Sequence, residues 1–397
     1  MLGLRQTVAC PYCYYEVDLS NVNMRCSGRP APGKNRCEQV ADAKRVKVLL
    51  DGTATYPSFK PEKFSLRDRE ALCPSCGGAS NTRVCPVCHS ALPASFTANS
   101  PIFGVVGVKS SGKTVMLTML ARELTTTVAR RFDASIDQVG KSALMDKMHA
   151  WQRDMESGGD LPPATAVYSA AETVPAVIEW RYTTSGPLGL ARERSTILSF
   201  YDTAGEDLTT MESARNQHYL EAASGLILIL DPFGFPTNRD RALTRGIPTT
   251  TLDIAPIDIL RAITEMLRAS EGTKTNKKIK RPLAVVLGKI DAFFDLVGPD
   301  HPLRRPSGDG PFFDEKESLD LHNYVEGLVA DWQGDDVLRM LQHNYGTYRF
   351  FAASALGAEP GYGATRRRVN SRGVSPHRVT EPLLWLMATR GFVPRGS

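Results

Sequence analysis

The chain has 397 residues, of which 42% are hydrophobic and 23% charged, and its 48 Lys and Arg against 43 Asp and Glu give a net charge of +5. This composition excludes a wholly disordered or fibrous chain, and the length suits more than one domain. Apolar runs such as that of residues 226–230, which stops at Asp231, are far short of the roughly 18 residues that would suggest a membrane helix. No secretory signal opens the chain, so we expect a cytoplasmic protein.

The cysteines mark a separate module at the start of the chain. All eight lie within the first 88 residues, and three CxxC pairs account for six of them. The last two pairs are spaced to place four thiolates around one tetrahedral Zn²⁺, and the other four cysteines suffice for a second ion. Four protein ligands leave no open position for water, so we expect structural zinc. The predicted ligands are Cys10, Cys13, Cys26, Cys37, Cys73, Cys76, Cys85 and Cys88.

Disulfides, redox chemistry and interleaved zinc sites are the competing interpretations of these cysteines. A reducing cytoplasm disfavours disulfides, and three CxxC pairs with two further cysteines exceed what a redox motif needs. We favour sequential sharing, in which the first four cysteines bind one ion and the last four bind the other, because residues 43–72 read as a strand and linker of their own. His89 follows Cys88 and could be a substitute ligand, but a surface histidine is the simpler interpretation.

A strand, a glycine-rich loop and a helix follow one another after the cysteine module. Residues 101–106 read as a short buried strand, and residues 115–124 have a helical pattern. The GxxxxGK[ST] motif between them predicts a phosphate-binding loop, in which N–H groups curl around phosphates, Lys113 reaches the β and γ oxygens, and Thr114 offers its hydroxyl to Mg²⁺. The predicted nucleotide ligands in this loop are Gly107, Lys109, Ser110, Ser111, Gly112, Lys113 and Thr114.

Three further apolar segments each lead into a polar loop. The carboxyl ends of parallel strands are where an open sheet assembles its ligand site, so we expect these loops to meet. They are residues 196–201 followed by DTAGE (202–206), residues 282–287 followed by GKID (288–291), and residues 348–352 followed by ASAL (353–356).

These four motifs, in this order, resemble those of the TRAFAC class of GTPases, and the DTAG sequence at a strand end resembles that of Ras-like small GTPases. The resemblance covers residues 100–391. The double zinc ribbon in front of such a domain is more specifically similar to bacterial double-GTPase-type proteins. The resemblance implies an α/β fold: a P-loop NTPase domain with a mostly parallel sheet flanked by helices, preceded by a small double zinc-ribbon module.

The resemblance also implies roles around the γ-phosphate. Asp202 would hold Mg²⁺ through a water, and the N–H of Gly205 would sense the γ-phosphate. Thr165 fits the position of the sensing Thr of the first switch, which also reaches Mg²⁺, and Thr173 is the alternative. Glu206 stands where Ras-like enzymes carry the Gln that orients the attacking water.

Around the base, the resemblance implies that Asp291 accepts hydrogen bonds from guanine N1–H and the 2-amino group. The stem of Lys289 would pack on the base, the N–H of Ala355 would meet guanine O6, and Ser354 would brace the loop that Leu356 completes. Adenine lacks the two donors, and leaving the Asp291 carboxylate unpaired would cost about 1–3 kcal/mol.

Two positions depart from the usual pattern. Gly288 replaces the Asn or Thr that precedes Lys-x-Asp, which removes a side-chain tether to the phosphate-binding loop. Lys109 stands where Ras-like enzymes have a Gly. Lys109 and Glu206 could approach one another over the γ-phosphate and slow hydrolysis, or Lys109 could simply point to solvent, which is the interpretation we slightly favour.

We divide the chain into a double zinc-ribbon module (residues 1–95), a P-loop GTPase domain with insertions (residues 96–392) and a tail (residues 393–397) that matches the end of a common protease-cleavage linker. The inserted residues 137–155 are expected to be helical, and residues 239–251 are expected to be a loop. Residues 381–389 read as a closing helix whose apolar face covers the sheet.

These observations predict a GTP-binding molecular switch with slow, Mg²⁺-dependent hydrolysis of GTP to GDP and phosphate. Its switch loops and zinc ribbons would signal the nucleotide state to an unidentified effector or activating protein, and the resemblance makes a nucleotide-dependent homodimer plausible. A zinc-ribbon scaffold that binds nucleotide without cycling and a P-loop ATPase are the alternatives. A nucleic-acid partner is not expected, because acidic residues are interspersed among the basic ones of the zinc module and aromatic interleaving is missing.

Overall fold

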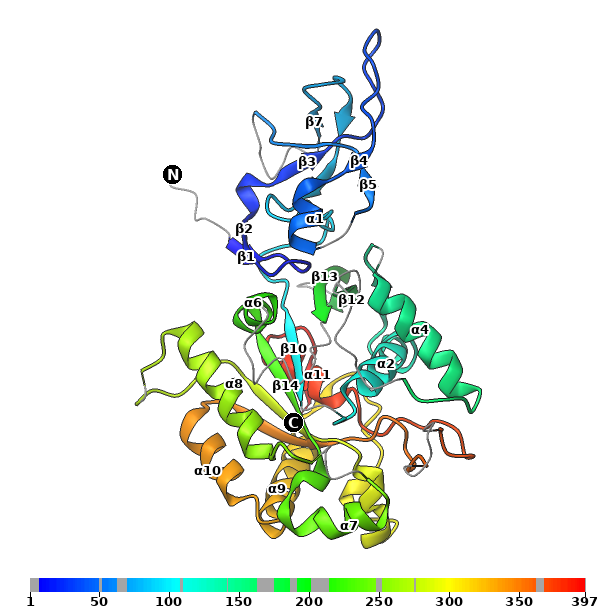
Figure 1. Ribbon diagram of the computed structural model, residues 1–397, viewed down its shortest axis with the longest axis vertical. Helices are drawn as coiled ribbons and strands as arrows, with labels where there is room; N and C mark the ends of the chain where they lie inside the picture. The colour runs from blue at the N-terminus through cyan, green and yellow to red at the C-terminus, as the bar shows by residue number, and fades with distance from the viewer. Residues whose placement is uncertain are drawn as a thin grey trace. The chain divides into compact units, whose positions relative to one another are not determined.

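The protein divides into two compact units (Figure 1). Unit 1 consists of Met1–Ile102, Ser135–Leu144 and Tyr168–Tyr201, and unit 2 of Phe103–Ala134, Met145–Val167 and Asp202–Ser397. The computed structural model describes residues 7–49, 52–62, 70–107, 110–140, 142–162, 175–185, 191–200, 214–247, 252–274, 276–361 and 368–396. Both units combine separate parts of the sequence, and the domain boundary after residue 95 stays a prediction.

The first part of unit 1 consists of short antiparallel strands and one helix. Its elements are β1 (Thr7–Ala9) paired with β2 (Glu16–Asp18), β3 (Asn23–Arg25) paired with both β6 (Ser58–Phe59) and β9 (Thr82–Val84), β4 (Val40–Ala41) paired with β5 (Ala54–Thr55), β7 (Ala71–Leu72) paired with β8 (Ala79–Ser80), and α1 (Ala43–Leu49). Strands of two or three residues bury little apolar surface, so this part needs further cross-links for stability.

A second antiparallel sheet completes unit 1. Its strands are β11 (Ala134–Gln138), β12 (Ala176–Ser185) and β13 (Ala191–Phe200), in that order. The strand predicted at residues 196–201 forms the end of the longer β13, but it pairs antiparallel with β12 instead of lying among the parallel strands, so its expected place in the parallel sheet was wrong. All ten residues of β12 pair with β13 in register, from Ala176 opposite Phe200 to Ser185 opposite Ala191.

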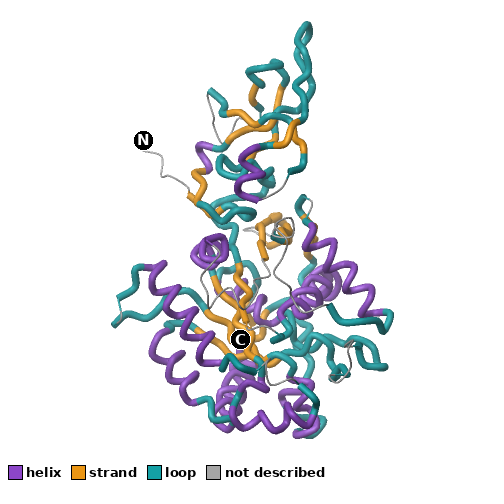
Figure 2. Tube along the Cα trace, viewed as in Figure 1, coloured by secondary structure: helices purple, strands orange, loops and turns teal. Residues whose placement is uncertain are grey.

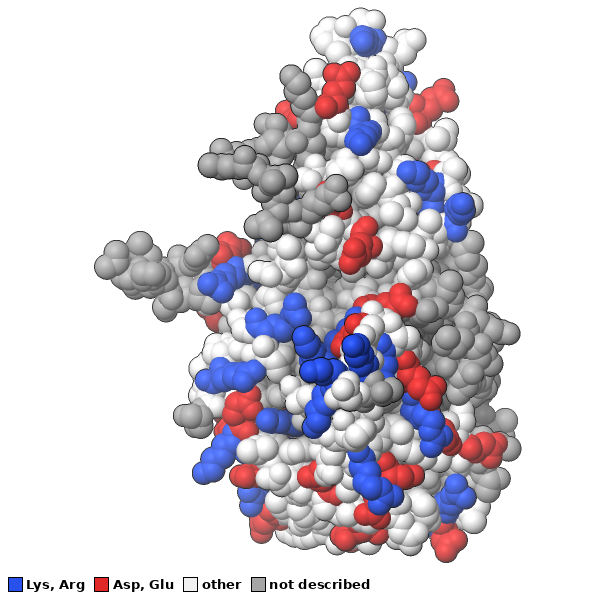
Figure 3. Space-filling view, turned by 90° about the vertical axis from the view of Figure 1, so that its left-hand side faces the viewer, with Lys and Arg blue, Asp and Glu red and all other residues white. Residues whose placement is uncertain are grey.

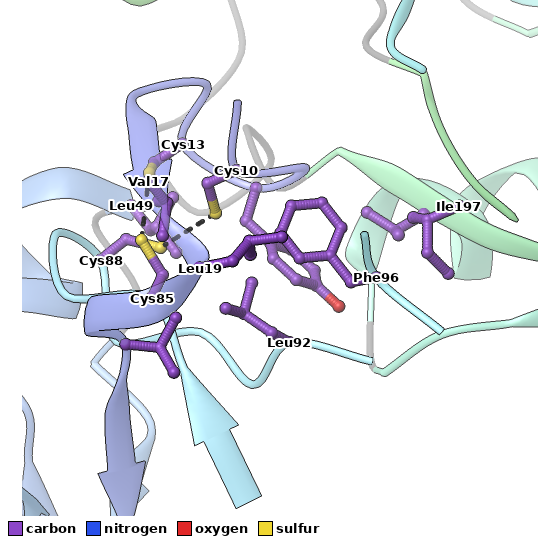
Figure 4. Close-up of a cluster of buried hydrophobic side chains, with 13 residues drawn as sticks. Cys10, Cys13, Val17, Leu19, Leu49, Cys85, Cys88, Leu92, Phe96 and Ile197 are labelled. Atoms are coloured by element: carbon purple, nitrogen blue, oxygen red, sulfur yellow. Dashed lines mark hydrogen bonds between the residues drawn. The ribbon is translucent and has the colours of Figure 1, made fainter. Parts of the chain in front are cut away.

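One apolar cluster joins the two parts of unit 1 (Figure 4). Phe96 and Leu92 from the end of the cysteine module pack in the same cluster as Val177 of β12 and Ile197 of β13. Beside it, the hydroxyl of Ser199 donates to the carbonyl of Pro11 over 2.7 Å. The cysteine module and the second sheet therefore share a core.

Unit 2 is built on a parallel sheet. Its strands are β10 (Phe103–Gly107), β14 (Gly225–Leu230), β15 (Leu283–Leu287) and β17 (Tyr348–Ala352), in that order. Every residue of β10, β14 and β15 is buried, which is why these strands read as continuous apolar runs. Helices flank the sheet (Figure 2), and the predicted α/β fold of a P-loop NTPase is confirmed.

The flanking helices begin and end at recognisable signals. Helix α8 has Pro256 at its first position and left-handed Gly272 after its last, and buried side chains recur every three or four residues from Ile259 to Leu267. Besides α8 (Pro256–Glu271), the helices are α2 (Lys113–Glu123), α3 (Ala129–Arg131), α4 (Ala143–Glu156), α6 (Ala214–Ala222), α7 (Arg239–Thr244), α9 (Glu315–Asp331), α10 (Asp335–Asn344) and α11 (Glu381–Thr389). A short parallel pair, β16 (Phe313–Asp314) with β18 (Arg395–Gly396), completes the described strands.

Three predictions about the helices have different outcomes. The closing helix is confirmed as α11, whose side chains are buried against β14 and β15. The helix expected within residues 137–155 is α4, although the segment begins as strand β11. The expectation of a loop over residues 239–251 was wrong for its first six residues, which form helix α7. None of the helices in the described part of the chain is long and apolar enough to cross a membrane.

Candidate functional site

The phosphate-binding loop connects β10 to α2. Gly112 caps the helix in the left-handed region, with a φ of 92°, and Ser110 also has a positive φ of 63°. Such backbone turns N–H groups toward one side and forms a concave anion site at the start of the helix. The buried Lys113 ammonium donates to the carbonyl of Gly107 over 3.1 Å, so it reaches back across the loop. Thr114 is buried in the first turn of α2.

The strand ends bring further predicted residues to the same edge of the sheet. In the register of the sheet, Gly107 at the end of β10 pairs with Ile229 of β14. Ile229 pairs with Val286 of β15, and Val286 pairs with Phe351 of β17. All four strands are parallel, so the loops that follow them leave the sheet at one edge. A Cβ on Gly288 would lie 3.3 Å from the carbonyl oxygen of Ser111. Where the usual side-chain tether is missing, the two loops approach directly.

Lys289 is held by a partner that the sequence reasoning missed. Its backbone is left-handed, with a φ of 50°, and its ammonium lies 2.6 Å from a carboxylate oxygen of Asp231. Asp231 directly follows β14, is buried, and accepts a hydrogen bond from the N–H of Phe233. Left-handed backbone at a non-glycine residue is costly and is often found at functional sites. The available signal was an acidic residue at the carboxyl end of a buried parallel strand.

Asp231→Asn is expected to lower the free energy of unfolding by about 1–2 kcal/mol, because the Lys289 ammonium loses its charged partner but remains partly exposed. Urea unfolding monitored by tryptophan fluorescence measures the change. Asp240→Asn, which alters an exposed carboxylate on α7, is the matched control and should be neutral. Equal stability of the two variants would contradict this role for Asp231.

Asp291 lies almost fully buried beyond Lys289. Burial raises the pKa of its carboxyl group, while a hydrogen bond with the Ser354 side chain and the charge of Lys289 lower it. A carboxylate whose cost of burial is only partly offset by its neighbours is well suited to bind a ligand that carries two N–H donors.

The loop after β17 is braced from within. The hydroxyl oxygen of Ser354 accepts hydrogen bonds from the N–H groups of Leu356 and Gly357, over 3.3 and 2.8 Å. Ala355 packs against a cluster that includes the buried Leu356 and Met119 of α2. The Ser354–Leu356 loop therefore lies against both Asp291 and the helix that follows the phosphate-binding loop.

Several predicted site residues lie outside the described residues: Lys109, Thr165, Thr173, Asp202, Gly205 and Glu206. Their roles in sensing the γ-phosphate, holding Mg²⁺ and orienting water stay predictions.

The cysteines of unit 1 form two groups of four with sulfur atoms close together. Their sulfur atoms all lie within 4.8 Å of one another in each group, and four of the sulfur pairs are 3.5–3.9 Å apart. Zinc–sulfur bonds of about 2.3 Å in a tetrahedron require sulfur atoms about 3.8 Å apart, so both groups fit Zn²⁺. The outer tetrad is Cys10, Cys13, Cys85 and Cys88, and the inner tetrad is Cys26, Cys37, Cys73 and Cys76.

This pairing is nested in the sequence, neither sequential nor interleaved, so the predicted sequential sharing was wrong. The reason is the antiparallel pair β3 and β9, in which Asn23 lies opposite Val84 and Arg25 opposite Thr82. Cys26 follows β3 and Cys85 follows β9, so the two cysteines leave opposite ends of the pair. The first and last CxxC pairs consequently meet at one end and the middle cysteines at the other.

His89 is not the surface histidine that we expected. It is buried and left-handed, with a φ of 53°. Its Nδ1–H donates to the carboxylate of Asp42 over 2.8 Å, and its Nε2 accepts from the Asn23 amide over 3.3 Å. The positive φ of His89 turns its ring back into the module. There the ring contacts Asp42, just before α1, and Asn23 of β3 instead of a metal site.

A model of the Double-GTPase 2 family matches residues 101–317. A relative from Mycolicibacterium smegmatis, SaeC, is described as a proposed ESX-1 scaffolding and assembly protein; it is 25% identical over 336 residues, which cover 78% of this chain and 80% of SaeC. Among solved structures, the S. cerevisiae Ski7 GTPase-like domain with GDP and inorganic phosphate is 14% identical at a TM-score of 0.29, over 65% of this chain and 44% of that chain. The signal recognition particle receptor SRb-GTP/SRX complex from Chaetomium thermophilum is 13% identical at a TM-score of 0.27, over 66% and 94%.

Proposed function

Because the chain belongs to the Double-GTPase 2 family, we propose that it is a molecular switch that binds GTP and slowly hydrolyses it, with Mg²⁺, to GDP and phosphate. One observation carries the proposal: the phosphate-binding loop, the Lys289–Asp291 loop and the Ser354–Leu356 loop follow parallel strands that end at one edge of one sheet. That edge is where open α/β sheets bind their ligands.

In this proposal the nucleotide lies across the three loops. The N–H groups of the phosphate-binding loop and Lys113 hold the phosphates, and Asp291 accepts hydrogen bonds from guanine N1–H and the 2-amino group. The Thr114 hydroxyl binds Mg²⁺, together with Asp202 and Thr165. Carboxylate and hydroxyl oxygens suit this hard cation, which when bound neutralises charge on the β- and γ-phosphates.

Slow turnover is proposed because Glu206 replaces the water-orienting Gln. Glu206→Gln is therefore expected to increase the rate of single-turnover GTP hydrolysis, and Lys109→Gly also changes it if Lys109 reaches Glu206 over the γ-phosphate. Unchanged rates in both variants would remove these residues from the proposed hydrolysis step.

A partner protein would read the nucleotide state, and the zinc module supplies its docking platform. Zinc held by four thiolates has no open position for catalysis, which supports a structural role. Figure 3 shows basic side chains grouped near the middle of one face with acidic ones beside them. Free cysteines grouped as metal ligands support a reducing, cytoplasmic location.

A nucleotide-binding scaffold that does not cycle is the second candidate. The name of the SaeC relative supports it, since scaffolding and assembly need no turnover. Under this alternative GTP would stabilise one conformation of the protein without being consumed.

Displacement of a fluorescent GDP analogue by GDP, GTP, ADP and ATP, followed by single-turnover hydrolysis with Mg²⁺ or with EDTA, tests the proposal. We expect only GDP and GTP to compete, and slow release of phosphate only with Mg²⁺. Guanine binding without phosphate release would favour the scaffold. Equal competition by adenine nucleotides would overturn the guanine assignment and favour an ATPase.

A further inference from the structure

Arg245, the residue directly after α7, connects two loops of the proposed guanine site. Its guanidinium forms a bidentate ion pair with Glu359. Nε donates to Oε2 over 2.6 Å, and Nη2 donates to Oε1 over 3.1 Å. The same Nη2 donates to the carbonyl of Ala292 over 3.3 Å. Ala292 directly follows Asp291, and Glu359 lies in the chain that follows the Ser354–Leu356 loop.

A second arginine of α7 supports the same point. Arg241 donates to the carbonyl of Ala292 over 2.9 Å, and its guanidinium lies 5.1 Å from the ring centroid of Phe293. Arg241 also pairs with Asp295. Arg241 of α7 and Arg245 just after it therefore both bind the chain immediately after Asp291, whereas the left-handed Lys289 lies before Asp291 in the sequence.

The ion pair also has an electrostatic consequence. Burial is the main cause that raises the pKa of Asp291, and the negative charge of Glu359 raises it further, while Ser354 and Lys289 lower it. Guanine recognition needs an ionised Asp291 carboxylate. Pairing Glu359 with Arg245 offsets a charge that would otherwise oppose that ionisation.

We infer that Arg245 is a positioning residue for guanine recognition, which clasps the Asp291 and Ser354 loops together through Ala292 and Glu359. The inference rests on the proposed function, because it concerns the same site. It assigns the α7 insertion a task within nucleotide selection that no motif of the sequence indicates.

The Arg245→Ala variant should release bound fluorescent GDP about tenfold faster than wild type, because a charge-assisted link to both loops is lost. It should also show a smaller preference for GDP over ADP in competition. Arg245→Lys should be intermediate, since lysine cannot form the bidentate pair. Arg261→Ala is the matched control: Arg261 is an exposed arginine of α8 that pairs with Asp258, and its loss should change neither quantity.

The double variant Arg245→Ala/Glu359→Gln tests the electrostatic part. It should recover part of the GDP preference lost in Arg245→Ala, because no unpaired carboxylate then remains beside Asp291. A merely structural role for the pair predicts no such recovery, and its absence would overturn this part of the inference.

Release rates of fluorescent GDP, measured by stopped flow, and competition by GDP and ADP are determined on the full chain. Thermal unfolding checks that each variant is folded. A GDP release rate and a preference for GDP over ADP that match wild type in Arg245→Ala would overturn the positioning role of Arg245. If that variant fails to fold, wild-type behaviour of both Arg245→Lys and Glu359→Gln would overturn it instead. Wild-type protein that binds ADP as well as GDP would refute the proposed function itself, and the clasp with it.

Discussion

Replacement of all four cysteines of the outer tetrad by serine is expected to leave one zinc ion per chain. The inner tetrad keeps its four thiolates, within 4.8 Å of one another, so its ion remains. Replacement of the first four cysteines of the sequence, Cys10, Cys13, Cys26 and Cys37, should instead remove both ions, because each tetrad then keeps only two ligands. Metal analysis by mass spectrometry on protein purified with excess zinc measures both outcomes.

The two variants are controls for one another, because each lacks four of eight cysteines. Sequential sharing would reverse the result: the first variant would lose both ions and the second would keep one. Chelation of wild-type protein should also unfold the cysteine module, since each structural site contributes about 10–16 kcal/mol of apparent binding energy in small zinc domains. Circular dichroism before and after chelation, and after zinc is restored, measures this dependence.

Asp291→Asn is expected to weaken GDP binding by about 10- to 100-fold, because a buried carboxylate that accepts two hydrogen bonds is replaced by an amide that presents a donor to donors. Xanthosine diphosphate should gain affinity in the same variant, since the carbonyl at position 2 of xanthine accepts from that amide. Competition against a fluorescent nucleotide measures both changes.

Asp258→Asn is the control for Asp291→Asn, because Asp258 is an exposed carboxylate on α8 that pairs with Arg261. It should leave both nucleotides unaffected. Unchanged GDP affinity in Asp291→Asn would mean that the Lys289–Asp291 loop does not recognise the base, whatever the phosphate-binding loop holds.

The sheet of unit 2 could be predicted because its information is local. Strands buried on both faces must be apolar along their whole length, so the apolar residues 282–287 predicted β15. Residues 381–389, which are apolar almost throughout, likewise predicted the buried helix α11. The phosphate-binding loop was equally local, because one short motif sets both its backbone and its chemistry.

The partners within the site could not be predicted in the same way. Lys289 and Asp231 are 58 positions apart, and Arg245 and Glu359 are 114 positions apart. Each pair depends on which strand ends and insertions become neighbours, which periodicity does not encode. The zinc pairing failed for the same reason, since the β3 and β9 register decides which cysteines meet.

The nested order of the two tetrads also sets an order of events during synthesis. The inner tetrad lies between the two halves of the outer one, with Cys37 and Cys73 36 positions apart and Cys13 and Cys85 72 positions apart. A ribosome must therefore make residue 76 before the inner ion has all its ligands, and residue 88 before the outer ion does. The smaller loop also closes at lower entropic cost, so we expect the inner tetrad to assemble before the outer one.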